Sequence, residues 1–264
     1  MRRLFPALLM AFFAVACLSA QAEDWNKSFP VTGKAAVHVD ANDAEIEVHA
    51  SDGKQIEAHV TTRGLKIGPT DVRITDHQTG DRLDLEIHKP SQHFCIGICN
   101  QSVHVELIVP RQADLYLHTG DGSIRVDGVQ GDLRLDSGDG SIEARAVDGK
   151  LNADTRDGHI RTDGRFDALD LHTGDGHVEA EVRPGSRMTS GWTIRTGDGR
   201  VELRLPPDFA AELDAHTGDG HVDIDFPVTV SGSMHENTVR GKMNGGGQLL
   251  ELRTGDGNIT VAKM

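Results

Sequence analysis

Aromatic side chains are scarce in this 264-residue chain: they make up 4% of it, with one Tyr, two Trp and eight Phe. Proteins that bind bases or sugars by stacking need exposed rings, so such a platform would be poorly supplied here. Basic residues are outnumbered as well, because 27 Lys and Arg face 41 Asp and Glu and leave a net charge of −14. An acidic surface repels phosphate, which excludes nucleic acid and anionic membranes as expected partners.

Long apolar segments are missing beyond the N-terminus. Arg2 and Arg3 precede an apolar run at residues 4–16, and Ala-Gln-Ala follows at residues 20–22. This order is typical of a signal peptide, and the run is shorter than the ~20 residues that span a bilayer. We therefore predict that residues 1–22 are a signal peptide, cleaved on export to the periplasm or cell surface, and that the chain has no transmembrane span. Lipid anchoring at Cys17 is the alternative.

Cysteine is nearly absent. Of three in the sequence, Cys95 and Cys99 remain once residues 1–22 are removed. In an oxidising compartment an isolated pair is typical of a disulfide, and so short a loop would add about 2 kcal/mol of stability. A redox pair or half of a metal site are the alternatives, although the spacing is CxxxC and the sequence holds no second pair to complete a zinc site.

The chain does contain a nine-residue repeat, which runs through residues 119–180. The sixth position of every nine is aliphatic: Ile124, Leu133, Ile142, Leu151, Ile160, Leu169 and Val178. The eighth position is apolar or small, and the seventh and ninth are almost all polar. Apolar residues two apart, separated by polar ones, indicate a short strand with one buried face.

Asp-Gly turns recur between these strands, and two nines make an 18-residue unit. The turn pairs are Asp121 and Gly122, Asp139 and Gly140, Asp157 and Gly158, Asp175 and Gly176, Asp198 and Gly199, Asp219 and Gly220, and Asp256 and Gly257. We expect the glycines to adopt positive φ, or to pack so closely that a Cβ would clash. We expect the aspartates to bond their own backbone in Asx turns.

The repeats predict an all-β fold: a β-solenoid, or β-helix-like stack of short strands, with 9-residue half-repeats and 18-residue coils. A single nine buries too little apolar area to offset the entropy lost on ordering it, so each coil needs stacked neighbours. An antiparallel meander is the alternative geometry. Residues 23–110 are predicted as an N-terminal β region of capping or irregular coils, continuous as one domain with the repeat region at 111–264.

The run VELIVP at residues 105–110, followed by LYLHTGDG at residues 115–122 and the repeated TGDG-x-[IV] unit, resembles the bacterial DUF4097 family. These are β-strand-repeat proteins, also called putative adhesins. The resemblance covers residues 30–262 and implies an exported or envelope-associated all-β repeat protein without an assigned enzymatic activity. It brings no catalytic residues. The CxxxC segment and the His-rich turns depart from the pattern expected of the family.

The turn aspartates are the first candidate ligands, because a column of carboxylates could bind calcium. In the nonapeptide calcium motif the Asp stands two residues before the buried aliphatic. Here Gly122 occupies that place before Ile124, and the Asp comes one residue earlier. An Asx turn explains the residue without a metal, so we predict no metal in these turns.

Histidines also recur. One repeat position holds His118, His172 and His216, and another holds His159, His177 and His221. Two His that flank a carboxylate could bind zinc or copper, or form a pH-responsive ladder of charges. The second position also holds Ser, Arg and Asn in other repeats. Such scatter is typical of a solvated turn.

Glu143, Asp163, Asp170 and Glu179 are expected on outward faces, where paired carboxylates could cleave a polysaccharide. They recur as repeat decoration, and the sequence holds no GxSxG, no HExxH and no phosphate-binding Gly-rich loop before a helix. We therefore predict no enzymatic activity, no catalytic residues and no cofactor. The predicted function is an adhesin-like or scaffold module that binds an envelope protein or a glycan. The alternatives are a carbohydrate-active β-helix enzyme and a periplasmic protein that binds metal through the Asp and His turn columns.

Overall fold

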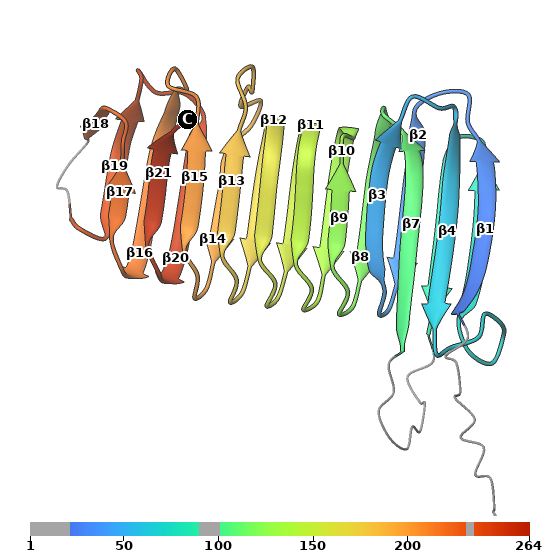
Figure 1. Cartoon of the computed structure of the whole chain (residues 1–264). Coiled ribbons are helices and arrows are strands. Elements are labelled where there is room, and N and C mark those ends of the chain that lie inside the picture. Colours follow the sequence, from blue (N-terminus) through green and yellow to red (C-terminus); the bar gives the residue numbers. More distant parts are fainter. Residues whose placement is uncertain (1–21, 90–100, 231–234) are drawn as a thin grey trace, which may run out of the picture.

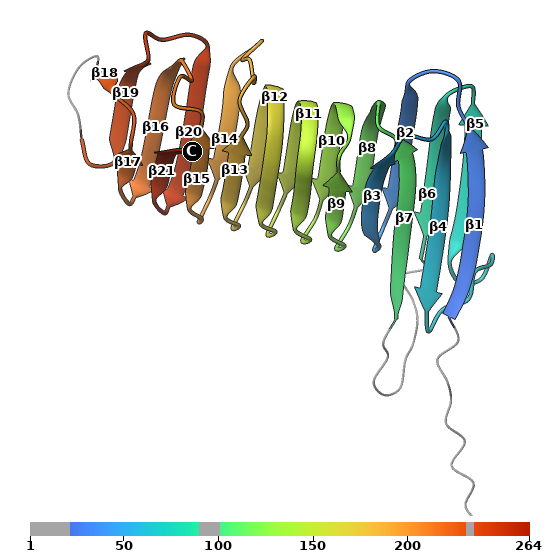
Figure 2. The same cartoon turned by 45° about the horizontal axis from the view of Figure 1, so that its top comes forward.

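The computed structural model describes residues 22–89, 101–230 and 235–264. Within these ranges the chain forms 21 strands and no helix, so none of the described residues belongs to a helix that could cross a membrane. The strands stack into a flattened solenoid with two faces (Figures 1 and 2). The prediction of an all-β solenoid is confirmed.

We call the two faces A and B and give their strands in spatial order from the N-terminal end of the stack. Face A contains β5 (Arg73–Thr79), β6 (Arg82–His88), β2 (Ala35–Ala41), β8 (Ala113–Thr119), β10 (Gln130–Ser137), the second halves of β11 (Ile142–Thr155) and β12 (Ile160–Thr173), β14 (Trp192–Thr196), β20 (Leu249–Asp256), β16 (Ala211–Asp219), β19 (Thr238–Met243) and β18 (Val228–Val230). Face B contains β1 (Ala22–Pro30), β4 (Gln55–Arg63), β7 (Ser102–Pro110), β3 (Glu45–Ser51), β9 (Ile124–Asp127), the first halves of β11 and β12, β13 (Val178–Val182), β15 (Val201–Leu205), β21 (Ile259–Lys263) and β17 (Val222–Ile224).

Neighbouring coils of the repeat region are parallel and share one register. Ile142 pairs with Ile124 in the preceding coil and with Ile160 in the next, each 18 residues away. All seven aliphatics at the sixth repeat position are buried, with at most 3% exposure. The predicted 18-residue coil is therefore confirmed, and the antiparallel meander is wrong for this region. In β11 and β12 the two nines of a coil join into one bent strand of 14 residues.

The order of the coils in space differs from their order in the chain at both ends. The first coil, β2 and β3, lies between the coil of β6 and β7 and the coil of β8 and β9. The last coil, β20 and β21, lies between the coil of β14 and β15 and the coil of β16 and β17. Each terminal coil is thus paired on both sides.

Antiparallel strands border the parallel stack at its outer limits. At the N-terminal end β5 pairs with β6, and β1 and β4 follow β7. At the C-terminal end β19 and β18 follow β16 on face A. Such strands limit the parallel edge that further copies of the chain could extend.

Three of the few aromatic residues fill a wider part of the core near inserted loops. Trp192 lies between Phe166 and Phe209, with ring centroids 6.5 and 5.2 Å away, respectively. Loops precede Trp192 and contain Phe209, so the coil is larger here and needs bulkier side chains to fill it.

Candidate functional site

The Asp-Gly turns lie along one edge of the solenoid, where each coil passes from face A to face B. A Cβ placed on Gly140 would lie 1.9 Å from the carbonyl oxygen of Gly122 in the preceding coil. Equivalent collisions, at 1.8 to 2.3 Å, occur at the other six turn glycines, and none of the seven has a positive φ. The expectation of positive φ is wrong, and the close approach of the neighbouring coil explains these glycines. Positive φ occurs at the opposite edge, at Gly128 (75°) and Ala146 (49°).

A column of buried hydroxyls completes each turn. The members are Thr119, Ser137, Thr155, Thr173, Thr196, Thr254 and Thr217, and each donates to a turn carbonyl of the adjacent coil at 2.7–2.9 Å. Thr155 also accepts the N–H of Gly158 at 3.3 Å. Among the hydrogen bonds of the described residues, none joins a turn Asp carboxylate to its own turn, so the expected Asx turns are replaced by these hydroxyls.

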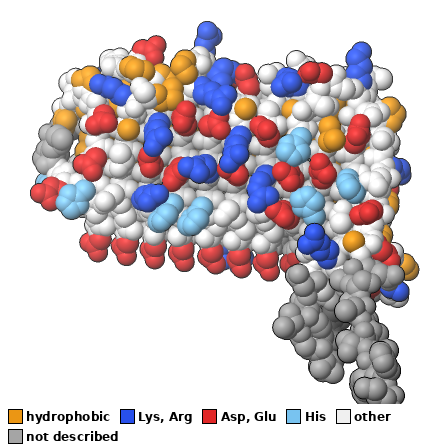
Figure 3. Space-filling view, viewed as in Figure 1, with side chains coloured by type: hydrophobic (Ala, Val, Ile, Leu, Met, Phe, Trp, Pro, Cys, Tyr) orange, Lys and Arg blue, Asp and Glu red, His pale blue; other side chains and the backbone are white. Residues whose placement is uncertain are grey.

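The seven turn aspartates are exposed and form a ridge along the lower edge of the molecule (Figure 3). Asp139 accepts a hydrogen bond from Nη1 of Arg156 at 3.1 Å. Neighbouring members stand one coil apart, which is about 4.8 Å in a sheet. Nowhere in the described ranges do three His, Cys, Asp or Glu side chains come together in a way that could hold a metal ion.

The two histidine columns lie on different faces. His118, His172 and His216 point outward from face A, whereas His159, His177 and His221 stand where face B begins. The rings of His159 and His177 stack, with centroids 5.0 Å apart. The Nδ1 atom of each accepts a backbone N–H from the next coil, at 3.0 and 3.2 Å. Burial, together with the charges of Arg200 and His159, lowers the pKa of His177.

Only one of the carboxylates considered for catalysis is separated from the others. Glu143, Asp163 and Glu179 point outward from face B, where Asp163 and Glu179 line one hollow of about 420 Å³, whereas Asp170 belongs to face A. On face B acidic and basic side chains alternate (Figure 3) and pair with one another. A hydrogen bond from Arg200 lowers the pKa of Glu179, which keeps this carboxylate ionised and is unfavourable for a general acid.

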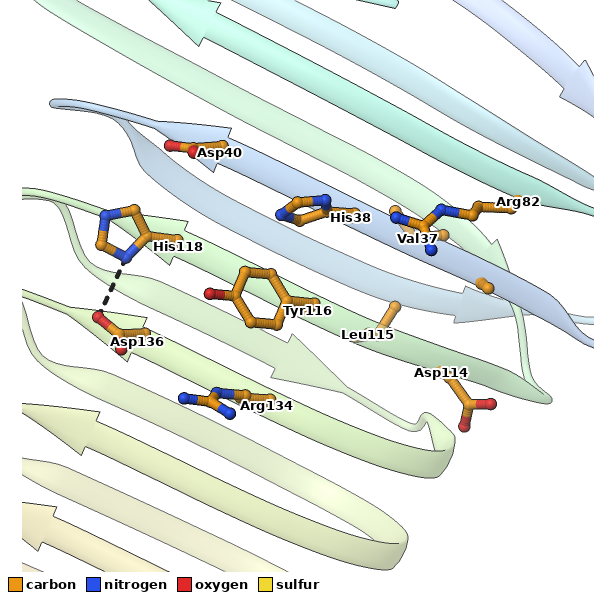
Figure 4. Close-up of a pocket in the computed structure, with 11 residues that line it drawn as sticks. Val37, His38, Asp40, Arg82, Asp114, Leu115, Tyr116, His118, Arg134 and Asp136 are labelled. Carbon is orange, nitrogen blue, oxygen red and sulfur yellow. Dashed lines mark hydrogen bonds and ion pairs between the residues drawn. The ribbon is translucent and has the colours of Figure 1, made fainter. Parts of the chain in front are cut away.

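Face A contains a shallow groove of about 720 Å³ around Tyr116 (Figure 4). It extends over β6, β2, β8 and β10, and its lining residues are Ala36, Val37, His38, Asp40, Arg82, Asp114, Leu115, Tyr116, His118, Arg134 and Asp136. Strand alternation places Tyr116 outward, because Leu115 and Leu117 on either side are buried in the core. Its 38% exposure makes Tyr116 the one aromatic among the large exposed hydrophobic side chains of the described residues.

Cross-strand neighbours hold the Tyr116 ring in place. His38 on β2 meets it edge-on with centroids 4.6 Å apart, and the guanidinium carbon of Arg134 on β10 lies 5.6 Å from its centre. His118 Nδ1 lies 3.0 Å from Asp136 Oδ1, which fixes both side chains at the end of the groove toward which the Tyr116 hydroxyl points (Figure 4). A fixed ring beside polar groups is the usual composition of a small-ligand site.

Three aspartates and two arginines line the groove, and only some of these carboxylates are neutralised. Arg82 donates to both carboxylate oxygens of Asp84 beside the groove, which lowers the pKa of Asp84. Asp154, next to Asp136 on β11, behaves in the opposite way: burial and the charges of Asp136 and Asp170 raise its pKa. Asp154 itself has no Lys or Arg ion pair among the described residues, although the charges of His172 and Arg134 partly offset the shift.

Sequence reasoning missed both Tyr116 and the hydroxyl column. The signal for Tyr116 was its place as the single Tyr, at an outward position between two inward leucines. The signal for the hydroxyls was the Thr or Ser that begins each TGDG-type turn. Residues 1–21 of the predicted signal peptide, with Cys17, and the pair Cys95 and Cys99 lie outside the described residues, whereas Ala22 is the first residue of β1.

Comparisons with known proteins point to one family. The family model of Toastrack DUF4097 matches residues 35–179 and 111–262. A structure similar to this chain is that of a putative adhesin from Bacteroides fragilis, 12% identical with a TM-score of 0.48, which covers 92% of this chain and 97% of that one. A putative cell adhesion protein from Clostridium sporogenes is 15% identical with a TM-score of 0.44, over 92% of this chain and 100% of that one.

A putative lipid binding protein from Parabacteroides distasonis is 12% identical with a TM-score of 0.43, over 93% of this chain and 98% of that one. No curated protein matches the chain. At these identities and scores the structural likenesses concern the fold alone, and the function has to be argued from the site.

Proposed function

This chain belongs to the Toastrack DUF4097 family, and on that premise we propose that it is a non-enzymatic binding module of the cell envelope that holds a glycan on face A. The observation that carries the proposal is the exposed Tyr116 ring, fixed by His38 and Arg134 in a groove of about 720 Å³. The solenoid fold does not require an aromatic side chain at this outward position. The single Tyr of the chain nevertheless stands at the centre of the groove.

The groove has the mixed chemistry that sugars need. A pyranose has an apolar face that packs on an aromatic ring, and hydroxyls that bond to polar side chains. Tyr116 supplies the ring, while Asp40, His118 and Asp136 supply acceptors and donors at its margin. Face B offers much less, because its charged side chains already pair with one another.

The charge of the chain limits the class of glycan. A net charge of −14 and the aspartates of the groove would repel uronate, sulfate or phosphate groups. The proposal is therefore restricted to neutral or positively charged glycans. Export to the periplasm or cell surface belongs to the same proposal, and it is supported by the leader pattern of residues 1–22.

A direct binding experiment tests the proposal. Protein from residue 23 onward would be applied to a glycan array, and hits would be measured by calorimetry for the wild type and for Tyr116→Ala. We expect at least ten-fold weaker binding in the variant, which is about 1.4 kcal/mol. Thr260→Ala, an outward position on face B, is the matched control and should bind as the wild type does. Equal binding by Tyr116→Ala, or no glycan bound by the wild type, would refute the proposal.

The rival function, a carbohydrate-active enzyme, is favoured by one observation. The pKa of Asp154 is raised by burial and by Asp136 and Asp170, as the pKa of a general acid would be. An enzyme would release reducing ends from a polysaccharide, and Asp154→Asn would abolish this turnover. If the protein is a binding module, neither the wild type nor Asp154→Asn releases reducing ends from any polysaccharide.

A further inference from the structure

The groove around Tyr116 continues beyond Arg134. A second hollow of about 370 Å³ covers β10, β11, β12 and β14, and Arg134 lines both hollows. In the register of the sheet Tyr116 pairs with Arg134, which pairs with Asn152; Asn152 pairs with Asp170, and Asp170 with Thr193. These five outward positions on adjacent strands form a straight row along the solenoid axis, and we call this row with its two hollows the track.

Small side chains open the second hollow. Ala168 and Gly191 are among its lining residues and leave the sheet surface low beside Asp170. From Tyr116 to Thr193 the row crosses four inter-strand gaps, or about 19 Å at ~4.8 Å for each gap. An extended polymer fits a channel of this shape better than a compact ligand does, because it can repeat the same contact on each successive strand.

The charges of the track favour a cationic occupant. Lys150 is already paired with Asp132 at 3.0 Å, and Arg134 lies over the Tyr116 ring. Asp170 accepts from the amide of Asn152 at 3.2 Å. Asp136 and Asp154 are cross-strand partners two residues along from the row of Asp170, and the partner of Asp154 on β12 is His172. Within the described ranges Asp136, Asp154 and Asp170 have no Lys or Arg among their ion pairs. Burial, and to a lesser extent the charges of Asp136 and Asp170, raise the pKa of Asp154, while His172 and Arg134 lower it. Ammonium groups beside these carboxylates would favour their ionised form.

We propose that the track is the binding site of a linear amino-sugar polymer, which lies along the solenoid axis with a ring on Tyr116 and ammonium groups beside Asp136, Asp154 and Asp170. The inference rests on the proposed glycan-binding function and names its ligand class. Tyr116 and Arg134 contact a sugar ring, whereas the carboxylates attract the positive charges of the polymer. A longer polymer reaches more of these carboxylates and therefore binds more tightly.

Calorimetry with glucosamine oligosaccharides, from the dimer to the hexamer, tests the inference. We expect affinity to rise with length and to fall with added salt. Asp154→Asn and Asp170→Asn should each weaken hexamer binding about ten-fold and leave dimer binding unchanged. Asp223→Asn, at an outward position on face B, is the matched control and should change neither. Circular dichroism would check that each variant is folded.

Three results would overturn the inference. Equal affinity for the dimer and the hexamer would mean that the track is not used. An N-acetylated hexamer bound as tightly as the free amine would remove the role of the carboxylates, while the proposed glycan function would stand. Oligolysine bound as tightly as the hexamer would indicate a general cation surface. If no saccharide of any kind binds, the proposed function itself fails.

Discussion

The hydroxyl of Thr155 lies 2.9 Å from the carbonyl oxygen of Gly140, to which it donates its hydrogen bond across one coil of the solenoid. The same carbonyl oxygen lies 2.1 Å from the point where a Cβ of Gly158 would stand. Thr155 also accepts the N–H of Gly158 at 3.3 Å. The Thr and the Gly of one turn thus enclose a single carbonyl of the turn before it.

Replacing Thr155 by Val keeps the shape of the side chain but removes its hydrogen bonds to the Gly140 and Gly138 carbonyls and from the Gly158 N–H. Because Thr155 is buried, two backbone groups would be left without partners, and we expect the free energy of unfolding to fall by about 1–3 kcal/mol. Thr155→Ser should be nearly neutral, since Ser137 fills the same position one coil earlier. Urea denaturation of the two variants measures the difference, and equal stability of Thr155→Val and the wild type would disprove the role of the hydroxyl.

Gly140→Ala should destabilise through a collision, since the new Cβ would stand 1.9 Å from the Gly122 carbonyl oxygen. Moving the coils apart should lower stability by about 1–3 kcal/mol or more. Gly68→Ala is the control, because its Cβ would meet nothing within 4 Å.

Asp139→Asn should have little effect in thermal melts, with or without EDTA. A chelator-sensitive loss in that variant would instead indicate a metal ligand.

Ala146→Gly should stabilise the protein. Ala146 has a φ of 49°, and Gly128, 18 residues earlier in the same repeat position, has a φ of 75°. Left-handed backbone costs an alanine about 1–2 kcal/mol, which outweighs the entropy that glycine loses, so a net gain of about 0.5 kcal/mol is expected. Ala262→Gly, in ordinary strand backbone on β21, should lose stability. If thermal melts place both variants below the wild type, the strain at Ala146 is not released by glycine.

Asp214→Asn should weaken the C-terminal coils in a pH-dependent way. Arg253 donates to the Asp214 carboxylate at 2.9 and 3.0 Å and Arg240 at 3.0 Å, and these bonds lower its pKa from 3.8 to about 2. The folded pKa lies below the unfolded one, so the ionised group stabilises the fold above pH ~4, and this contribution disappears as the pH falls toward ~2.

After allowance for screening by solvent, the loss in Asp214→Asn at neutral pH should be about 1 kcal/mol. Chemical denaturation between pH 2 and 7 would follow it. Asp208→Asn, at an exposed loop position, serves as the control and should match the wild type throughout. A stability difference in Asp214→Asn that does not change with pH would contradict the assignment.

Deleting residues 139–156 removes one 18-residue coil and joins two equivalent turn positions, since the backbone N–H of Arg156 bonds to the Gly138 carbonyl. We expect this shortened protein to fold, with a lower melting temperature because one coil of core is lost. Deleting residues 249–264 should instead abolish cooperative unfolding, because β20 and β21 join β14 and β15 to β16 and β17. Circular dichroism melts compare the two, and a folded C-terminal truncation would show that the outer coils can pair without the inserted one.

The repeat made the coil geometry predictable. Ile142 and its equivalents fixed the buried face and the 18-residue register, because period-two burial and a constant coil length admit few packings. The turn glycines were predicted for two alternative reasons, of which close approach was right. Backbone dihedrals at Gly140 follow from how near Gly122 comes in space, and that distance is a property of stacking rather than of the local sequence.

The insertion of the terminal coils could not be read from the sequence. Leu250 fits the same repeat position as Trp192 and Leu213, so its register suits any coil of the stack and does not say which neighbours it joins. The groove was hidden for a related reason. His38 and Tyr116 meet across two strands that lie far apart in the chain, and no local pattern records that pairing.

The position of the last coil in the stack also affects the order in which the coils can fold. During synthesis the chain emerges from its N-terminus, and a simple solenoid could fold coil by coil as it appears. Here β16 and β17 have no parallel neighbour until residues 249–263 arrive between them and β14 and β15. The coil of β16 and β17 therefore cannot complete its parallel pairing until residues 249–263 have been synthesised. A segment late in the sequence therefore closes the outer coils, and they cannot join the parallel stack before it has been made.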